Sequence, residues 1–332
     1  MRNISIVRTA ELRSVIDETR VIDAVRHALI DFAEGRTDAP PPGLLLSNDP
    51  PGDCHVKFAR SASHDLMIVK TATGFYRNGS LNLPVNDGLV NVFSASTGQL
   101  CCVIDDGGLL TAMRTAAAGL IAARLGWDDK SKTVGIIGTG HQAEIQAAWA
   151  ARHLSIRPVQ LFGRSLKKAT ELAERLAVRG LKSVVHCSTE SLTSAADTII
   201  TCTSSSSPVI ESQHLRPGHH IVSLGADGPG KCEIADNVYG IADAIAVDDL
   251  SQAMKRDDFA SAVDRKLLLP ARARPMGELL AAHRSMRNCH RDITLINLCG
   301  TAACDLAVTD YLLSLHPNGG HPREEAFTGV PT

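Results

Sequence analysis

Residues 134–154, VGIIGTGHQAEIQAAWAARHL, decide the fold of this chain. A short apolar run leads into Gly138 and Gly140, and Ala143 follows at the start of a segment with helical spacing. This is the G-x-G-x-x-G/A pattern, in which the first glycine permits a tight turn, the second lets the backbone approach a pyrophosphate, and the small third residue keeps helix and sheet close. The alternative is a glycine turn that binds no nucleotide. We assign dinucleotide contacts to Gly138, Thr139, Gly140, His141, Gln142 and Ala143.

The sequence after this turn predicts a parallel sheet. From Thr133 onward, short apolar runs alternate with helical segments: TVGIIG, PVQLFG, SVVHCS, TIITCT, HIVSLG and AIAVDD. Strands that are apolar on both faces and separated by helices are typical of a parallel sheet covered on both sides. We therefore predict a doubly wound α/β domain of the Rossmann type over residues 121–300, which begins close to the polar stretch DDKSK at 128–132.

The first third of the chain has a different pattern. One amphipathic helix precedes the alternating runs HVKFAR, LMIVKTATGFY, GLVNVFSA and LCCVIDD, which indicate antiparallel strands. An alanine-rich helix, LLTAMRTAAAGLIAARLGW at 109–127, comes next. We predict an α+β domain for substrate binding and dimerisation over residues 1–120, to which residues 301–332 return. Its strands have more edge than one subunit covers easily, which leaves room for a second copy.

Composition and charge exclude several classes of protein. The chain has 332 residues with 34 basic and 36 acidic side chains, and it lacks the basic stripe that binds a phosphate backbone, so we expect no nucleic-acid partner. No apolar run approaches the roughly 18 residues of a spanning helix, and the start lacks an export pattern. We therefore expect a cytoplasmic protein without membrane contact. The nine cysteines form no CxxC pair, and we expect them to stay reduced and to hold no metal.

The end of the second strand of the α/β domain bears on the choice between NAD and NADP. An acidic residue there would bind the ribose 2′-hydroxyl of NAD, but the stretch PVQLFGRSLKKA has Gly163 at this position. Arg164, Ser165 and Lys167 follow and could hold a 2′-phosphate, so we favour NADP slightly. Alternatively, these cations only face solvent at the start of a helix. We assign further cofactor contacts to Gly163, Arg164, Ser165, Thr203 and Gly225.

Four charged residues are candidates for chemistry. Lys57, Lys70 and Arg114 stand in apolar or small-residue surroundings, where a cation is costly unless it meets an anion. Each could bind a substrate carboxylate or form an internal ion pair. Asp227 lies in the glycine-rich loop SLGADGPGKCEI after a strand of the α/β domain, at the edge where such sheets bind ligands. Its carboxyl group could exchange a proton with a substrate nitrogen or only cap a turn.

Four motifs stand in order along the chain: IVKTATGFYRNGSLNLP, DDGGLLTAMRTAAAG, GIIGTGHQA and SLGADGPGK. Together they resemble the ornithine cyclodeaminase/mu-crystallin family, from about residue 5 to about residue 315. The resemblance implies that Lys70 and Arg114 bind the substrate carboxylate, that Asp227 is the catalytic acid or base, and that the glycine turn holds NAD or NADP. It also implies a homodimer formed through the first domain.

Two places depart from the family pattern. The loop PPPGLLLSND has no arginine for the carboxylate, which leaves Lys57 or Arg60 as substitutes. The late strand ITLINLCGTAACDL has Asn297 at a commonly acidic position and Cys299 where a hydroxyl residue is common, so a substrate side-chain amine would lose a possible acidic partner. Our substrate-binding candidates are Lys57, Lys70 and Arg114, and our catalytic candidates are Asp227 and Lys70.

The resemblance implies hydride transfer between a nicotinamide and the α-carbon of a small amino acid. We predict an NAD(P)H-dependent imine (ketimine) reductase or amino-acid dehydrogenase. One alternative is an ornithine cyclodeaminase, in which the hydride returns after the side-chain amine closes a ring and ammonia leaves. The other is a mu-crystallin-like protein that binds a cofactor or small ligand without turnover. The presence of Lys70, Arg114 and Asp227 argues against this last alternative.

Overall fold

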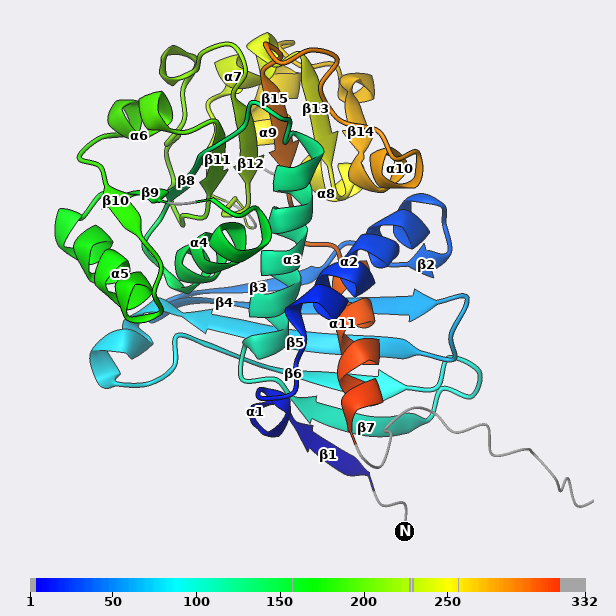
Figure 1. Cartoon of the computed structure of the whole chain (residues 1–332). Coiled ribbons are helices and arrows are strands. Elements are labelled where there is room, and N and C mark those ends of the chain that lie inside the picture. The colour runs from blue at the N-terminus through cyan, green and yellow to red at the C-terminus, as the bar shows by residue number, and fades with distance from the viewer. Residues whose placement is uncertain (1–3, 157, 227, 229, 256, 317–332) are drawn as a thin grey trace, which may run out of the picture.

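Two β-sheets connected by shared helices make up the protein (Figure 1). The computed structural model describes residues 4–156, 158–226, 228, 230–255 and 257–316. The first sheet has the order β1-β7-β6-β5-β4-β2, and β3 pairs with β4. Its strands are β1 (Ser5–Arg8), β2 (Thr37–Asp38), β3 (Gly43–Asn48), β4 (Pro51–Ser61), β5 (Met67–Phe75), β6 (Asn86–Phe93) and β7 (Leu100–Asp105). Neighbouring strands are antiparallel, as predicted, except that β1 runs parallel to β7.

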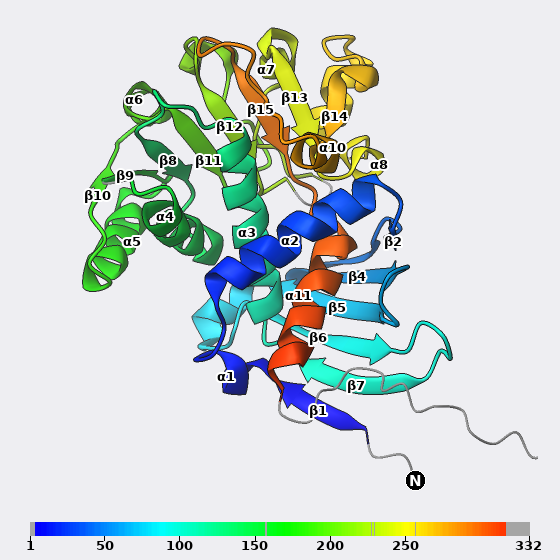
Figure 2. The same ribbon diagram turned by 45° about the vertical axis from the view of Figure 1, so that its right-hand side comes forward.

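Helices pack on one face of the first sheet (Figure 2). The helices of this part are α1 (Thr9–Leu12), α2 (Glu18–Ala33), α3 (Leu109–Leu125) and α11 (Ala302–Leu315), and η1 (Tyr76–Leu81) is a 3-10 turn after β5. Successive strand residues point to opposite faces, so Ile68 and Val90 are fully buried under the helices. Phe58 and Leu89 belong to the opposite face and are 40% and 39% exposed.

The described strands of the second sheet all pair in parallel, in the order β10-β9-β8-β11-β12-β15-β13-β14. Its strands are β8 (Val134–Ile137), β9 (Val159–Phe162), β10 (Ser183–Val185), β11 (Thr198–Thr201), β12 (His220–Ser223), β13 (Ala244–Val247), β14 (Ala273–Pro275) and β15 (Thr294–Asn297). The chain moves outward from β8 to β9 and β10 and then returns to β11 on the other side of β8. Such a switch point opens a crevice for ligands at the carboxyl ends of the strands.

Helices and short turns connect these strands. They are α4 (His141–His153), α5 (Leu166–Val178), α6 (Thr189–Ala195), α7 (Asp236–Ile241), α8 (Leu250–Ala253), α9 (Asp257–Asp264), α10 (Met276–Ala281), η2 (Ser212–His214) and η3 (Pro270–Arg272). The predicted fold class, a Rossmann-type α/β domain plus an α+β domain, is confirmed. Within the ranges that the structure describes, no helix combines the length and apolar character needed to cross a membrane.

Helix α3 belongs to both halves of the molecule. It packs against α2 and α11 over the first sheet and against α4, β11 and β12 of the second. Its many alanines, among them the fully buried Ala116 and Ala122, allow this close packing on several sides. The predicted domain boundary between residues 120 and 121 falls inside this helix. The residue bounds of the two domains therefore stay a prediction.

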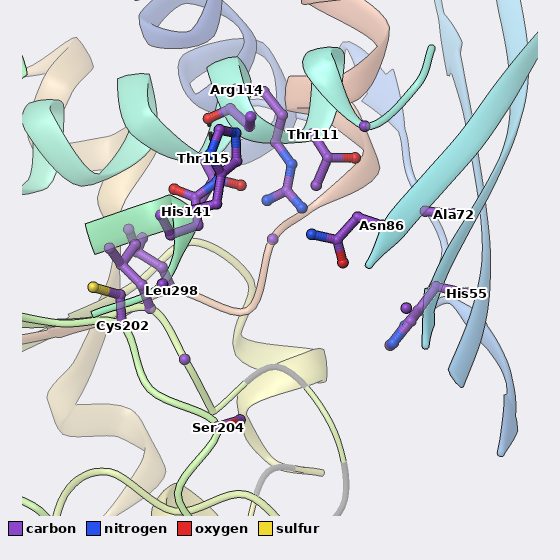
Figure 3. Close-up of a pocket in the computed structure, with 18 of the residues that line it drawn as sticks. His55, Ala72, Asn86, Thr111, Arg114, Thr115, His141, Cys202, Ser204 and Leu298 are labelled. Atoms are coloured by element: carbon purple, nitrogen blue, oxygen red, sulfur yellow. Dashed lines mark hydrogen bonds between the residues drawn. The ribbon is translucent and has the colours of Figure 1, made fainter. Parts of the chain in front are cut away.

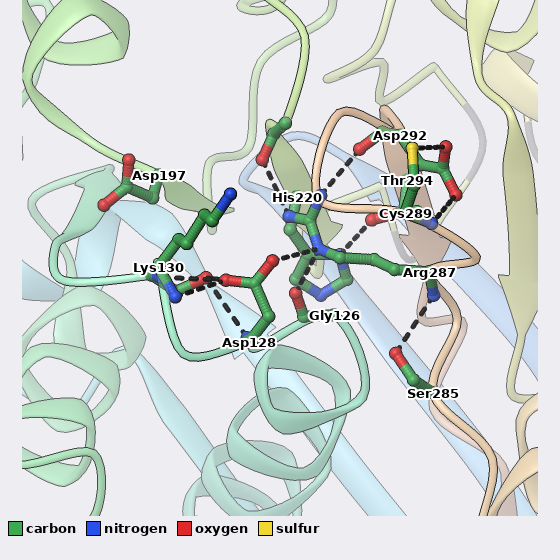
Figure 4. Close-up of polar contacts among 12 residues, drawn as sticks. Gly126, Asp128, Lys130, Asp197, His220, Ser285, Arg287, Cys289, Asp292 and Thr294 are labelled. Atoms are coloured by element: carbon green, nitrogen blue, oxygen red, sulfur yellow. Dashed lines mark hydrogen bonds and ion pairs between the residues drawn. The ribbon is translucent and has the colours of Figure 1, made fainter.

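The end of α3 is fixed to the second sheet by Arg287 (Figure 4). The Arg287 guanidinium donates to the carbonyl oxygens of Gly126, Asp292 and Gly218 at 2.5, 2.6 and 2.7 Å. Next to it, His220 of β12 is hydrogen-bonded to the Ala122 carbonyl oxygen on α3 at 2.9 Å. These contacts join α3 to the amino-terminal edge of the parallel sheet.

Candidate active site

A cavity of about 370 Å³ lies between the two sheets (Figure 3). The first sheet contributes His55, Ala72 and Asn86, and helix α3 contributes Arg114. The opposite wall comes from the glycine turn after β8 and from the residues that follow β11, β12 and β15. The cavity therefore opens at the carboxyl ends of the parallel strands, where the switch point predicts a ligand site.

The glycine turn has the geometry that dinucleotide binding requires. Gly138 has a φ of +138°, and a Cβ atom there would lie 2.7 Å from the carbonyl oxygen of Cys202. Gly140 caps α4, and a Cβ atom at Gly140 would meet nothing within 4 Å. Ala143 is fully buried against the sheet, as the motif requires. The turn thus leaves open space at the start of a helix, where a pyrophosphate fits.

The predicted cofactor residues are distributed around this turn. Gly140, His141, Gln142, Thr203 and Gly225 line the cavity. Burial lowers the pKa of His141 below its ordinary value, which favours the neutral imidazole. Their contacts with a cofactor stay predictions.

Position 163 has a steric reason to be glycine. A Cβ atom at Gly163 would lie 2.3 Å from Cγ2 of Thr139, so the two residues are in close contact. Ser165 caps α5 by accepting a hydrogen bond from the Lys168 amide at 3.4 Å, and Arg164 beside it is exposed. Packing against Thr139 therefore gives a reason for glycine at this position that does not depend on the choice between NAD and NADP.

A buried carboxylate organises the cations of the first domain. Asp305 of α11 is fully buried, and its Oδ1 lies 2.7 Å from Nζ of Lys70 and 3.2 Å from Nε of Arg114. Burial by itself would raise the pKa of Asp305, but Lys70, Arg114 and Lys57 together hold it below the ordinary value. The carboxylate is therefore ionised at neutral pH and fixes the shaft of Arg114 while its terminal nitrogens extend into the cavity (Figure 3).

The third cation meets Arg114 at the turn after β15. Nζ of Lys57 donates to the carbonyl oxygen of Gly300 at 2.7 Å. Gly300 has a φ of +82°, and a Cβ atom there would lie 2.6 Å from Nη1 of Arg114 and 3.2 Å from Nζ of Lys57. Asp248 holds this turn by accepting hydrogen bonds from the amides of Cys299 and Gly300 at 2.8 and 2.7 Å. The absence of a side chain at residue 300 lets both cations approach the same point.

The other predicted residues occupy different places. Lys70 is 1% exposed, and Lys57 lies opposite it in the sheet register. Neither lysine is among the described residues that line the cavity. Arg60 is exposed, whereas Lys57 is buried beside Arg114, so the structure favours Lys57 as the substitute for the missing arginine. Asp227 lies outside the residues that the structure describes. The roles of Lys57, Lys70, Arg114 and Asp227 stay predictions.

The two departures in the late strand have different surroundings. Asn297 is buried, and its Nδ2 donates a hydrogen bond to the hydroxyl of Tyr239 at 2.9 Å. Asn297 is not among the described residues that line the cavity. Cys299 does line the cavity. Asn297 therefore belongs to the buried core and not to the cavity wall.

Among the described residues, no group of three or more histidine, cysteine, aspartate or glutamate side chains could hold a metal ion.

The sequence reasoning missed three acidic residues that shape the site: Asp305, Asp248 and Glu233. An acidic residue inside the apolar stretch AACDLAVTDYLL was the available signal for Asp305. For Asp248, the signal was its place directly after the buried strand AIAV. Nothing in the sequence states which partner each would find.

Comparisons with known proteins agree with this architecture. A model described as the ornithine cyclodeaminase/mu-crystallin family matches residues 4–314. Alanine dehydrogenase of Archaeoglobus fulgidus is 30% identical over 305 residues, 91% of this chain and 92% of that protein. Delta(1)-pyrroline-2-carboxylate reductase of Bacillus thuringiensis subsp. konkukian is 25% identical over 312 residues, 92% and 95% of the two chains. A solved archaeal alanine dehydrogenase dimer with bound NAD has a TM-score of 0.83 and 28% identity, over 93% of this chain and 94% of that one. The protein belongs to the ornithine cyclodeaminase/mu-crystallin family.

Proposed function

We propose that the protein is an NAD(P)H-dependent reductase of 2-imino acids, or amino-acid dehydrogenase, that transfers hydride at the α-carbon of a small amino acid. The observation that carries the proposal is one cavity with a dinucleotide turn on one wall and Arg114 on another. Buried Lys57 meets Arg114 at Gly300, which also lines this cavity. The similar proteins named alanine dehydrogenase and Delta(1)-pyrroline-2-carboxylate reductase support this choice of reaction.

The residues of the chain have separate tasks in this reaction. Bound NAD(P)H supplies the hydride that reduces the imine carbon. Arg114 and Lys57 hold the substrate carboxylate, because a guanidinium and an ammonium at one point form strong charge-assisted hydrogen bonds with it. Asp305 keeps Arg114 and Lys70 in place. Asp227 gives a proton to the nitrogen as the electron pair of the C=N bond moves onto that atom.

The proposal extends to cofactor, compartment and assembly. Exposed Arg164 next to Gly163 supports a slight preference for NADP over NAD. The nine cysteines form no disulfide in the described part of the chain, which fits a reducing compartment, and we place the enzyme in the cytoplasm. Exposed apolar side chains, including Phe58 and Leu89, lie on the face of the first sheet that no described helix covers, and they support a homodimer through this domain. The small-molecule substrate is an amino acid or its imine.

Absorbance at 340 nm tests the reaction. The protein is supplied with NADPH or NADH and either cyclic imine carboxylates or 2-oxo acids with ammonia. We expect net consumption of the reduced cofactor that depends on the substrate. Release of ammonia from diamino acids without net consumption would identify a cyclodeaminase instead. Tight cofactor binding without either activity would favour the binding protein.

A further inference from the structure

Glu233 is a buried acid at the carboxyl edge of the second sheet. It is fully buried and lies in the stretch that follows the loop SLGADGPGKC. Its Oε2 accepts hydrogen bonds from the hydroxyls of Thr201 and Ser223 at 2.7 and 2.9 Å. These two residues end the neighbouring strands β11 and β12. The carboxylate therefore bridges two parallel strands at the edge where the cavity opens.

The same carboxylate binds the main chain of two turns that line the cavity. Oε1 accepts a hydrogen bond from the amide of Thr203 at 2.6 Å, and Oε2 accepts one from the amide of Gly225 at 2.7 Å. An amide can only donate, so both oxygens must accept, which the ionised form does. Burial acts in the opposite direction and raises the pKa of Glu233. The four donors act against this effect of burial and offset part of the cost of the buried charge.

The two turns touch each other closely at this point. A Cβ atom at Gly225 would lie 2.0 Å from the carbonyl oxygen of Thr203 and 2.6 Å from Oε1 of Glu233. Glu233 therefore occupies the contact between turns that come from different strands. Its bond to Gly225 joins two residues eight positions apart in the chain, and Lys231 between them lines the cavity.

We propose that Glu233 is a positioning residue, which fixes the Thr203 and Gly225 turns against the cofactor and sets the geometry of hydride transfer. The expected effect of Glu233 on kinetics rests on the proposed function, whereas its expected effect on cofactor binding is independent of that function. Without the carboxylate, the amides of Thr203 and Gly225 lose their acceptors, and the turns are free to separate. A shift of about 1 Å at such a site can cost on the order of 100-fold in rate.

The chain contains a matched control at the opposite edge of the same sheet. Asp197, directly before β11, accepts hydrogen bonds from the amide of Lys132 at 2.9 Å and from the hydroxyl of Thr133 at 2.8 Å, and it pairs with Arg216 at 3.0 Å. It also ties neighbouring strands together, but its amino-terminal position places it away from the cavity. Asp197→Asn therefore removes a comparable clamp without touching the site.

The experiment compares Glu233→Gln and Asp197→Asn with the parent protein. Binding of NADH and NADPH is measured by the fluorescence of the bound cofactor, at a temperature where circular dichroism shows each variant folded. Turnover is measured with unlabelled and C4-deuterated reduced cofactor. We expect Glu233→Gln to weaken cofactor binding at least 10-fold and to lower kcat at least 10-fold with a larger deuterium isotope effect. We expect Asp197→Asn to change each of these by less than 2-fold.

If Glu233→Gln does not fold, Ser223→Ala replaces it in the experiment. This variant removes one hydrogen-bond donor to Glu233 and leaves the charge, and it should change the same quantities about 2- to 5-fold. If the parent binds cofactor but turns over no substrate, the proposed function fails, and the binding comparison still decides the role of Glu233. Parent-like binding in Glu233→Gln, or equal losses in Asp197→Asn, would overturn the inference. In the second case, Glu233 contributes only to stability.

Discussion

Gly300 shows how a single residue can determine the chemistry of its neighbours. Its carbonyl oxygen accepts a hydrogen bond from Nζ of Lys57. A Cβ atom at residue 300 would stand against the terminal nitrogens of Arg114. Any side chain there would push the two cations apart. Neither cation could then stand where we propose that it binds the substrate carboxylate.

We therefore expect Gly300→Ala to raise the KM of the carboxylate substrate at least 10-fold, which corresponds to about 1.4 kcal/mol. Steady-state kinetics at saturating cofactor measures the change. Gly98→Ala is the control, because Gly98 has a φ of +69° with nothing within 4 Å of its Cβ position. It imposes the same kind of backbone strain far from the site. An unchanged KM in Gly300→Ala would show that the cations do not need this glycine.

Thr139 and Gly163 determine together what the cofactor-binding edge can accept. An aspartate at residue 163 would place its Cβ atom 2.3 Å from Cγ2 of Thr139. We expect Gly163→Asp alone to weaken binding of both NADH and NADPH. Adding Thr139→Ala should relieve the contact and turn the preference toward NADH, by about 1–3 kcal/mol for one charged hydrogen bond. Fluorescence titration of the single and double variants measures this coupling, and purely additive effects would contradict it.

Residues of the site differed in how well the sequence predicted them. Arg114 and the glycine turn lie in local motifs whose chemistry is readable from neighbouring residues. The ion pair between Lys70 and Asp305 joins positions 235 residues apart, and spacing along a chain gives no information about such a pair. From the sequence, Gly163 was interpreted only through the choice between NAD and NADP. Its contact with Thr139 depends on how two turns pack, which the sequence does not show.

At the scale of elements, periodicity predicted the strands and helices but not the way in which they meet. The apolar runs after Thr133 are indeed parallel strands, and the alternating runs before it are antiparallel strands. The alanine-rich stretch at 109–127 predicted the helix α3. The pattern of alanines could not show that this helix packs on both sheets, because small residues suit close packing against any partner.

Two histidines of β12 and its preceding turn make the stability of this sheet depend on pH. His220 is hydrogen-bonded to a carbonyl oxygen of α3 and to the hydroxyl of Thr294, and His219 is hydrogen-bonded to the carbonyl oxygen of Thr193. Burial lowers the pKa of each histidine from 6.5 to about 4. Between these values the unfolded chain binds a proton that the folded chain does not, so stability falls as pH falls.

We expect the free energy of unfolding to decrease by about 2 kcal/mol per histidine between pH 7.5 and pH 5. Urea denaturation at both pH values measures the difference. In His220→Gln the dependence should shrink by about half, whatever the stability of that variant at pH 7.5. Equal stability of the parent at the two pH values would contradict the assignment of neutral buried histidines.

At the scale of the whole molecule, the helices that the structure describes cover one face of the first sheet and leave the other without a helix packed on it. Ile6, Phe58 and Leu89 are 59%, 40% and 39% exposed on strands of that sheet. An apolar sheet face of this kind is costly in water and suits an interface between two copies. The sequence indicated free strand edges here, whereas the structure adds the apolar face as a second reason for a dimer.

We expect light scattering at micromolar concentration to give twice the chain mass of 35.3 kDa. Phe58→Glu should shift the protein toward the monomer, because a charge would then be buried in the interface. Val178→Glu is the control, because it adds the same charge at an apolar residue of α5 that is 90% exposed and lies outside the first sheet. A parent mass of about 35 kDa would remove the dimer from the account.

The central claim is that a carboxylate held by Lys57 and Arg114 brings an imine carbon to the reduced cofactor. Transfer of deuterium from C4-labelled NADPH or NADH tests it most directly, with mass spectrometry and NMR of the amino acid formed from a 2-oxo acid and ammonia or from a cyclic imine carboxylate. The account predicts one deuterium at the α-carbon of the product. It also predicts that Arg114→Ala forms much less of this labelled product. Product without the label, or ammonia released from a diamino acid with the labelled cofactor unchanged, would contradict it.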